Sequence, residues 1–418
     1  MTKIKELRCV IGGCRYSLDE VSYTCPVHGE VGTLDILYDY AALREAVDRD
    51  EISASKRNNF WRYKALLPVD ADSRVPPLAV GWTPLYDARR LADHFGLSRV
   101  WVKDDGANPT GSLKDRASAL VLARALEAGF STVSAASTGN AAAALAGLGA
   151  ALPEIEVLIF VPASAPSAKI AQLLVYGAIV LLVEGTYDDA FELCMQICQE
   201  QGWYLRNTGV NPFTTEGKKT VALEIAEQLD WQVPDVVAVS VGDGSIISGI
   251  HKGFCDLLHL GWIDRVPRLI GVQAEGSAVL AGAFAAGSSP EEIQRQSVTT
   301  IADSIAAELP RDRAKALRAV RETDGAYVTV SDDHIVTAIP KMAQLSGVFA
   351  EPAAAATFAG LERALRTGIL DPGESVCLVS TGNGLKDIES ARKSVSGELR
   401  VAADIDAVKT ALQTVKVL

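Results

Sequence analysis

From about residue 80 onward, the sequence alternates between short apolar runs and longer stretches with the composition of helices. This alternation predicts βαβ units and therefore parallel sheets. The predicted strands are 100–103, 132–136, 157–161, 179–183, 203–206, 236–241, 269–273, 327–330 and 376–379. The predicted helices include 115–127, 141–148, 167–176, 188–201, 216–229, 332–345 and 353–366. These are too many strands for one small sheet, so we expect an α/β fold with two doubly wound domains.

The first forty residues differ from the rest, because they hold three of the seven cysteines and one histidine. Cys9 and Cys14 form one pair, and Cys25 and His28 form the other. Two knuckles of this kind can bind zinc tetrahedrally. The first spacing is longer than the tight C-x2-C pair, so a zinc-binding ribbon and a metal-free remnant held by packing both stay open. The other cysteines are scattered, which indicates reduced thiols rather than a disulfide framework.

The charge of the chain bears on its partners. Asp and Glu total 52 against 40 Lys and Arg, which gives a formal net charge of −12. An acidic chain without a basic block is a poor candidate for binding nucleic acid or anionic membranes. We find no apolar run of about 18 residues, and the first residues contain no apolar core of a signal peptide. We therefore expect a cytoplasmic protein that acts on a small molecule.

The motif Asn108-Pro-Thr-Gly-Ser-Leu-Lys114 follows a predicted strand and leads straight into a helix. In an open α/β sheet, ligands bind at such loops. Lys114 lies at the first turn of the helix, beside the positive end of its dipole, where a purely structural lysine is electrostatically misplaced. The functional interpretation is an amine of lowered pKa that forms a Schiff base. The alternative is an ordinary exposed lysine.

Three further loops follow strands in the same way. The motif Ser137-Thr-Gly-Asn140 opens a helix and can bind a carboxylate through free backbone N–H groups, or simply cap the helix. The glycine-rich turn from Gly242 to Ile246 can curl round a phosphate, or be only a tight turn. Thr381 can bond a heteroaromatic nitrogen, or belong to a turn with two glycines.

Together these loops would meet the requirements of a pyridoxal-phosphate enzyme that acts on an amino acid. Over nearly its whole length the chain resembles the fold-type II pyridoxal-phosphate enzymes, the tryptophan synthase β-like class, and within them the threonine synthases. The motifs that carry the resemblance are Gly81-Trp-Thr-Pro-Leu85, Lys103-Asp-Asp-Gly-Ala-Asn-Pro-Thr-Gly-Ser-Leu-Lys-Asp-Arg116, Ala136-Ser-Thr-Gly-Asn140 and Thr381-Gly-Asn-Gly-Leu-Lys-Asp387. The cysteine-rich start is similar to that of archaeal-type members.

The resemblance implies a role for each matching residue. Lys114 is the catalytic lysine that holds pyridoxal 5′-phosphate and later shuttles protons. The other implied cofactor contacts are Asn140 at the ring hydroxyl, Thr381 at the ring nitrogen, and Gly242, Asp243, Gly244, Ser245 and Ile246 at the phosphate. The implied substrate-binding residues are Ser137, Thr138, Gly139, Asn140, Ala141, Asn207, Thr208 and Lys218. We expect the Asp243 side chain to turn away from the phosphate and cap the following helix.

The implied reaction converts O-phospho-L-homoserine and water to L-threonine and phosphate, by γ-elimination and β-addition, which makes the chain a carbon–oxygen lyase of threonine biosynthesis. A substrate with its own phosphate needs a second anion site, which the family partly places in an N-S-x-N-P-x-R-x-x-G-Q-K-T stretch. Here Thr214 stands at the arginine position, and threonine cannot replace a bidentate arginine. Lys218, Lys219 or Arg206 could supply the charge from another direction.

The resemblance also implies a domain organisation. We expect a zinc-ribbon-like segment over 1–40, a large cofactor-binding domain over 41–115 and 222–418, and a small mobile substrate-binding domain over 116–221 that closes the site. By the same analogy we expect a homodimer. The alternatives are a cysteate synthase-like β-replacement enzyme that uses O-phosphoserine, a threonine dehydratase-like lyase, and a non-catalytic binding protein on the same fold.

Overall fold

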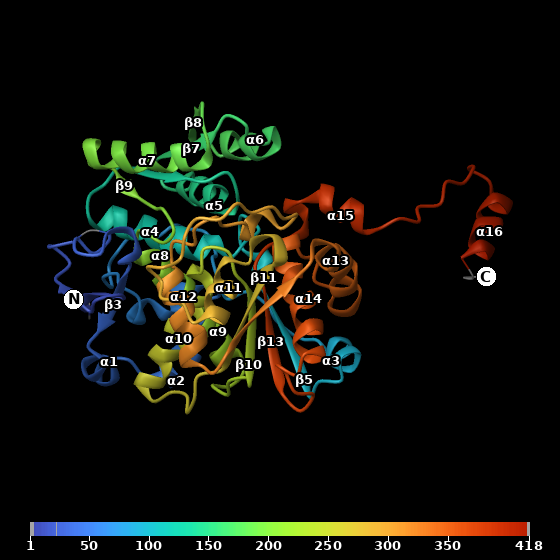
Figure 1. Cartoon of the computed structure of the whole chain (residues 1–418), viewed down its shortest axis with the longest axis horizontal. Coiled ribbons are helices and arrows are strands. Elements are labelled where there is room, and N and C mark those ends of the chain that lie inside the picture. Colours follow the sequence, from blue (N-terminus) through green and yellow to red (C-terminus); the bar gives the residue numbers. More distant parts are fainter. Residues whose placement is uncertain (1–3, 22, 416–418) are drawn as a thin grey trace.

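The computed structural model describes residues 4–21 and 23–415. Across these residues the strands form three sheets: a six-stranded sheet, a four-stranded sheet and a small three-stranded sheet at the N-terminal end (Figure 1). The two larger sheets are those expected of an α/β protein with two doubly wound parts. The residues outside the described ranges include the start of the predicted segment 1–40 and the end of the predicted segment 222–418.

The large sheet has the strand order β12-β11-β10-β13-β5-β4. All its neighbours run parallel except β4, an antiparallel edge strand that the sequence pattern did not reveal. Its strands β10, β11 and β13 are nearly continuous runs of buried residues, as expected for strands covered on both faces. The strands of this sheet are β4 (Leu85–Asp87), β5 (Arg99–Asp104), β10 (Val236–Ser240), β11 (Arg268–Ala274), β12 (Ala326–Val330) and β13 (Ser375–Ser380).

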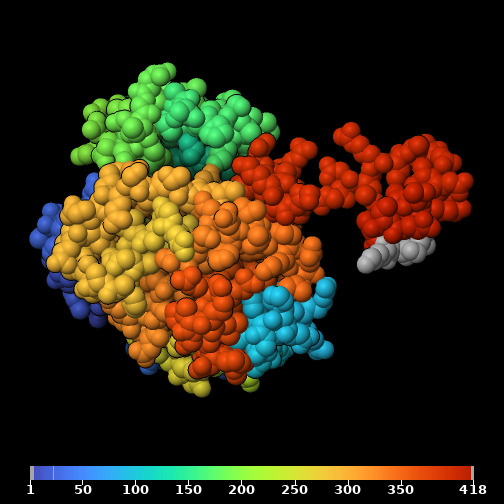
Figure 2. Space-filling view, turned by 45° about the vertical axis from the view of Figure 1, so that its right-hand side comes forward, coloured from blue at the N-terminus to red at the C-terminus, as the bar shows by residue number. Residues whose placement is uncertain are grey.

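The small sheet is wholly parallel and has the order β8-β7-β6-β9. Its strands follow one another in the chain: β6 (Thr132–Ala136), β7 (Glu156–Pro162), β8 (Ile179–Val183) and β9 (Tyr204–Leu205). With helices α5 to α7 it forms the green layer above the large sheet in Figure 1, and Figure 2 shows this layer resting on the yellow and orange body. The carboxyl ends of the strands in both sheets turn toward the region between them.

The helices cover the sheets and connect their strands. Before and within the small layer they are α1 (Tyr40–Ala46), α2 (Arg49–Ser53), α3 (Arg89–Phe95), α4 (Lys114–Glu127), α5 (Asn140–Gly149), α6 (Ser167–Val175) and α7 (Tyr187–Gln201). After it come α8 (Phe213–Lys218), α9 (Thr220–Gln228), α10 (Ser245–Leu260), α11 (Val279–Ala286), α12 (Arg313–Glu322), α13 (Asp332–Ser346), α14 (Pro352–Arg366), α15 (Ile388–Ser394) and α16 (Ile405–Thr414). Helix α16 stands off from the body (Figures 1 and 2).

The N-terminal sheet has the order β2-β1-β3, with β1 (Ile4–Cys9), β2 (Arg15–Tyr16) and β3 (Leu34–Tyr38) all antiparallel. Buried polar contacts fix it to the main body. The Asp35 carboxylate pairs with Arg318 of α12 at 2.8 Å, and Lys315 of the same helix donates to the carbonyl of Leu34 at 2.8 Å. The Tyr23 hydroxyl accepts a hydrogen bond from the backbone of Leu205 in β9, at 2.9 Å. The segment therefore touches both larger layers.

The predicted strands agree with those of the structure to within one residue at each end. One predicted helix was wrong as a single element: residues 216–229 divide into the end of α8 and α9, with Lys219 between them. Lys219 keeps helical dihedral angles, so the division lies in the hydrogen bonding and not in the backbone conformation. The first of the two helices also begins earlier, at Phe213, whose backbone N–H donates to the Asn211 side chain at 2.9 Å.

Candidate active site

A cavity of about 520 Å³ opens between the two larger sheets, where the four loops predicted to carry chemistry meet. Nearly all the predicted site residues line it: Lys114, Ser137, Thr138, Gly139, Asn140, Ala141, Thr208, Lys218, Gly242, Asp243, Gly244, Ser245, Ile246 and Thr381. Asn207 is the exception. It is buried behind the cavity wall, and its side-chain oxygen accepts a hydrogen bond from the backbone of Ala136 at 2.8 Å. Asn207 therefore supports the end of β6 instead of facing the cavity.

Lys114 is the first residue of α4 and projects into the cavity. The turn before it is pinned, because the backbone N–H of Leu113 donates to the carbonyl of Thr381 at 2.9 Å. In the part of the chain that the structure describes, no side chain forms a hydrogen bond or ion pair with the Lys114 ammonium group. Burial lowers the pKa of Lys114, and nearby Arg206 lowers it further against the opposing charge of Glu351. An amine in this setting is available to react with a ligand.

The N-terminus of α5 faces the same cavity. No described side chain caps this helix; Ser137 instead accepts a bond from the backbone of Gly139 at 3.3 Å. A Cβ added to Gly139 would meet no neighbouring atom, so the chain leaves open space there. The first N–H groups of α5 are thus free for an anion, and ordinary capping does not explain the motif.

The turn from Gly242 to Gly244 brings the N-terminus of α10 to the opposite wall. Gly244 has a φ of +90°, and a Cβ on it would lie 2.6 Å from Cβ of Ala316. This position therefore requires glycine. No capping side chain from the described residues occupies the N-terminus of α10, which leaves its N–H groups available.

The expectation that Asp243 caps α10 was wrong. The Asp243 carboxylate instead accepts a hydrogen bond from the backbone N–H of Arg311 at 3.2 Å, and the Asp243 carbonyl accepts one from Asp312 at 3.0 Å. Burial raises the pKa of Asp243. The side chain thus anchors the turn to the segment before α12, and Arg311 in turn pairs with Glu30 of the N-terminal segment.

Glu351, at the N-terminus of α14, is a cavity residue whose role the sequence left open. The side-chain amide of Asn140 donates to both carboxylate oxygens of Glu351, at 2.9 and 3.0 Å. Burial raises the pKa of this carboxyl group, while Asn140 and Lys114 oppose the shift. The Glu351-Pro352 pair that opens the helix was the signal in the sequence, but only the structure places it beside Asn140.

The end of β13 presents two hydroxyl groups. Thr381 lines the cavity, and Ser380 is fully buried with its hydroxyl oxygen unpartnered among the described residues. Both are neutral, and neither would hold a full positive charge on a ligand nitrogen.

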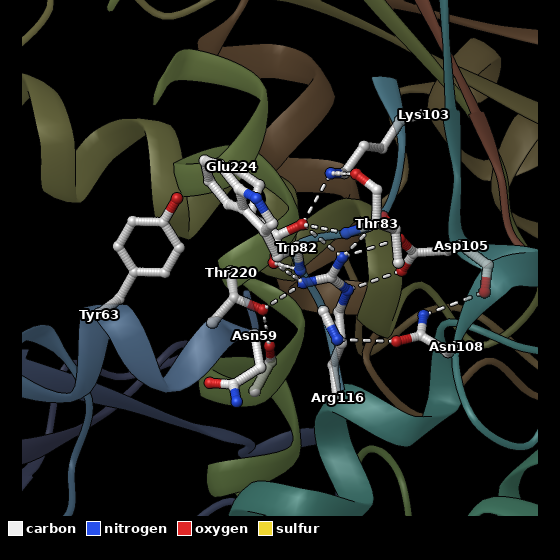
Figure 3. Close-up of polar contacts among 12 residues, drawn as sticks. Asn59, Tyr63, Trp82, Thr83, Lys103, Asp105, Asn108, Arg116, Thr220 and Glu224 are labelled. Atoms are coloured by element: carbon white, nitrogen blue, oxygen red, sulfur yellow. Dashed lines mark hydrogen bonds and ion pairs between the residues drawn. The ribbon is translucent and has the colours of Figure 1, made fainter. Parts of the chain in front are cut away.

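A fully buried ion network supports the start of α4 (Figure 3). The Arg116 guanidinium donates two hydrogen bonds to Asp105, at 2.7 and 2.8 Å, and two to Glu224, at 2.5 and 2.8 Å. Lys103 of β5 pairs with the same Glu224 at 2.7 Å. Arg116 lies two residues beyond Lys114, so the network fixes the helix turn that presents the lysine.

In the N-terminal segment, the sulfur atoms of Cys9 and Cys25 lie 3.5 and 3.3 Å from Nδ1 of His28. The three potential ligand atoms are all within 4.8 Å of one another. Cys14, the fourth predicted ligand, lies outside this group. The Tyr16 hydroxyl lies 3.0 Å from the Cys25 sulfur. The donor set fits a metal ion with three protein ligands and one further position.

Comparison with known proteins identifies the family. A family model described as pyridoxal-phosphate dependent enzyme matches residues 77–382. The threonine synthase of Methanocaldococcus jannaschii is 37% identical over 406 residues, which cover 97% of this chain and 99% of that protein. The threonine synthase of Methanosarcina acetivorans is 39% identical over 409 residues, which cover 97% and 98%. This chain belongs to the threonine synthase family.

Solved structures place this threonine synthase family member among the fold-type II enzymes, which confirms the fold predicted from the sequence. Threonine deaminase isoform 2 from Solanum lycopersicum superposes with a TM-score of 0.65 at 22% identity, covering 84% of this chain and 94% of that one. Diaminopropionate ammonia lyase from Escherichia coli also gives 0.65, at 17% identity, covering 82% and 92%. Within the described ranges, no helix has the length and hydropathy needed to cross a membrane.

The residues of the cavity fit the cofactor of the threonine synthase family. The uncapped N-terminus of α10 is suited to bind a phosphate. The Lys114 amine, which forms no hydrogen bond or ion pair with a described residue, is suited to react with an aldehyde. The Thr381 hydroxyl, which lines the cavity, is suited to bond a ring nitrogen. These are the three kinds of group that pyridoxal phosphate needs from a protein.

Proposed function

We propose that the protein converts O-phospho-L-homoserine and water to L-threonine and phosphate. The observation that carries the proposal is a cavity in which Lys114 has no partner among the described residues and faces both an uncapped helix N-terminus and buried cations. An amino acid with a carboxylate at one end and a phosphoryl group at the other matches this arrangement of positive charge.

Pyridoxal phosphate, when bound, supplies the electron sink that acidifies the hydrogens of the substrate. We assign Lys114 as its attachment point, Asn140 and Thr381 as its ring contacts, and residues 242–246 as its phosphate contacts. The neutral hydroxyl of Thr381 favours elimination and replacement over transamination, because it does not stabilise a full charge on the ring.

The N–H groups at the start of α5, with Ser137 and Thr138, hold the substrate carboxylate. Lys114 then takes the proton from Cα and one from Cβ, the Cγ–O bond breaks and phosphate leaves. Water adds its oxygen at Cβ, and protons return to Cγ and Cα. Lys114 is suited to both directions of transfer because burial lowers the pKa of its amine.

The direct test is product analysis. The purified, cofactor-loaded enzyme is incubated with O-phosphohomoserine, and threonine and free phosphate are measured together. We expect the two products in equal amounts. Phosphate without threonine, or no turnover, would contradict the proposal and favour a β-replacement enzyme, tested next with O-phosphoserine and sulfite. Formation of 2-oxobutanoate from threonine would favour the dehydratase-like alternative.

We also propose that Cys9, Cys25 and His28 bind a structural zinc ion, with Cys14 or water at the fourth position. We expect about one zinc ion per chain by elemental analysis, and we expect its removal by a chelator to lower the melting temperature by roughly 5–10 °C. Cys25→Ser should do the same, whereas Cys255→Ser, a thiol outside the group, should leave the zinc content unchanged. A zinc-free protein from zinc-supplemented growth would identify the segment as a metal-free remnant.

Three further parts of the proposal rest on the family resemblance. They are a small substrate-binding unit over 116–221 that moves to close the cavity, a homodimer, and a cytoplasmic location. Light scattering of the purified chain gives the mass that tests the dimer.

A further inference from the structure

Two cations in the cavity wall stand out because they are buried without a counter-ion. Arg206 follows β9 and is 1% exposed. Its Nε donates to the Ser118 hydroxyl at 3.1 Å, and its Nη1 donates to the Thr208 hydroxyl at 2.7 Å. Its Nη2 is buried with no hydrogen-bond partner among the residues that the structure describes. The guanidinium group thus contacts two neutral hydroxyls and keeps an unused donor.

Lys218, at the end of α8, is the second such cation. It is fully buried, lines the same cavity and donates to the Ser245 hydroxyl at 2.5 Å. No carboxylate within the described part of the chain pairs with it. Burial lowers the pKa of Lys218 well below its ordinary value, and the neighbouring charges of Arg206 and Lys114 add to the effect. The three cations therefore lie close enough to repel one another.

Two other fully buried cations of the same molecule, Arg116 and Lys219, are paired with carboxylates. Arg116 has Asp105 and Glu224, and Lys219 has Glu216 at 2.6 Å and Asp256 at 2.7 Å. An ion kept away from water costs several kcal/mol unless an opposite charge compensates it. Asp243 attracts both Arg206 and Lys218 from a distance, but within the described chain no carboxylate forms an ion pair with either cation. A bound anion is therefore the natural source of direct compensation.

Thr214, which stands at the arginine position of the family motif, does not bind an anion in this cavity. Thr214 is fully buried and does not line the cavity, and its hydroxyl donates to the carbonyl of Asn211 at 2.8 Å. Lys219 is held by its two carboxylates on the side of α10. Of the candidate replacements named from the sequence, only Arg206 and Lys218 face the cavity.

We propose that Arg206 and Lys218 form the subsite for the phosphoryl group of the substrate, in place of the arginine missing at Thr214. The inference rests on the proposed function. A phosphoryl dianion matches two cations, and the planar guanidinium group can donate two parallel hydrogen bonds to it. Thr208 orients that group through Nη1. Three aspartates that line the cavity have other partners: Asp188 pairs with Arg295, Asp303 pairs with Lys169, and Asp243 accepts a hydrogen bond from the backbone of Arg311.

The test compares Arg206→Gln and Lys218→Gln with the wild type. For each we expect kcat/KM for O-phosphohomoserine to fall by roughly 10- to 100-fold, which corresponds to one lost charged hydrogen bond. For Arg206→Gln, exchange of the Cα hydrogen of L-threonine in deuterated water, followed by NMR, should stay within about twofold, because threonine carries no phosphate. Arg295→Gln is the matched control, an arginine at the cavity rim that already pairs with carboxylates, and should behave as wild type.

A binding measurement separates this inference from the proposed function. Titration calorimetry with inorganic phosphate on the cofactor-loaded enzyme should show binding that Arg206→Gln weakens by at least about tenfold, whatever the natural substrate is. Arg206→Lys, which keeps the charge, should retain part of the affinity and guards against misfolding of the first variant. Unchanged phosphate affinity and kcat/KM in folded Arg206→Gln would overturn the inference. So would an equal loss of Cα exchange, and Lys218→Gln that weakens only cofactor binding would remove Lys218 from the subsite.

Discussion

Replacing Lys114 with alanine is expected to slow threonine formation by about 10⁴-fold or more, the largest effect of any single substitution in this protein. The amine is the proton carrier at both Cα and Cβ in the proposed reaction. The two neighbouring lysines of α8 and α9 are not expected to take over, because Lys219 is held by two carboxylates and Lys218 is assigned to the phosphoryl group of the substrate. The loss is measured as single-turnover formation of threonine by the cofactor-reconstituted variant.

The same substitution should leave the melting temperature unchanged or raise it. The Lys114 ammonium group has no hydrogen-bond or ion-pair partner among the described residues, and burial lowers its pKa despite the attraction of Glu351, so the cofactor-free protein loses little when the amine is removed. Stability and activity therefore separate, which distinguishes a chemical role from a structural one. Addition of methylamine should restore part of the rate, since the cavity of about 520 Å³ has room for it. Activity above about 1% of wild type without added amine would contradict the assignment of Lys114.

Replacing Arg116 with methionine is expected to lower the free energy of unfolding by about 3–5 kcal/mol. The guanidinium group neutralises Asp105 and Glu224 in a site with no solvent exposure, and methionine would leave Lys103, which pairs with Glu224, as the one cation of this network. Urea unfolding followed by circular dichroism measures the loss. Arg99→Met is the matched control: Arg99 pairs with Asp87 at the surface, where an ion pair contributes about 0–1 kcal/mol. Equal losses in the two variants would contradict the importance of the network.

The network also predicts a pH dependence. Burial alone raises the pKa of Glu224, but the charges of Arg116 and Lys103 outweigh it and lower the pKa from 4.5 to about 2. A carboxyl group with a depressed pKa in the folded state stabilises the protein above its unfolded pKa, and that contribution is lost as the pH falls. Stability should therefore decrease between about pH 4.5 and pH 2. Glu224→Gln should flatten this part of the curve, measured as unfolding free energy in urea at each pH.

Much of the fold could be predicted from the sequence because strand and helix patterns are local. The valine-rich runs of β10 and β13 predict buried parallel strands, and this prediction does not depend on which strands lie beside them. Strand β4 escaped notice because three residues at a sheet edge, two of them exposed, carry no hydrophobic run. The break at Lys219 was hidden because its dihedral angles stay helical and only the hydrogen bonding divides the helix.

The parts of the candidate site that backbone turns form could be predicted from the sequence. The contacts between side chains that are far apart in the sequence could not. A glycine in a turn between a strand and a helix indicates a positive φ, and Gly244 has one. The direction of the Asp243 side chain depends on Arg311, almost seventy residues away, and no local pattern indicates that contact. Arg206 was one of three equivalent candidates until the partners of Lys219 became visible. Long-range pairing is what local patterns do not contain.

The position of β13 has a consequence for how this protein is made. This strand lies between β10 and β5, and among the described strands it is the last to be synthesised. A ribosome delivers the N-terminal segments first. Until β13 emerges, β5 and β10 have no common neighbour, and the nascent chain carries two half-sheets with open edges. Thr381 follows β13 directly, so the cavity wall is completed by the same late event. We therefore expect the cavity to retain its cofactor only once β13 is in place. A chain that stops before β13 would lack the Thr381 wall and should release the cofactor.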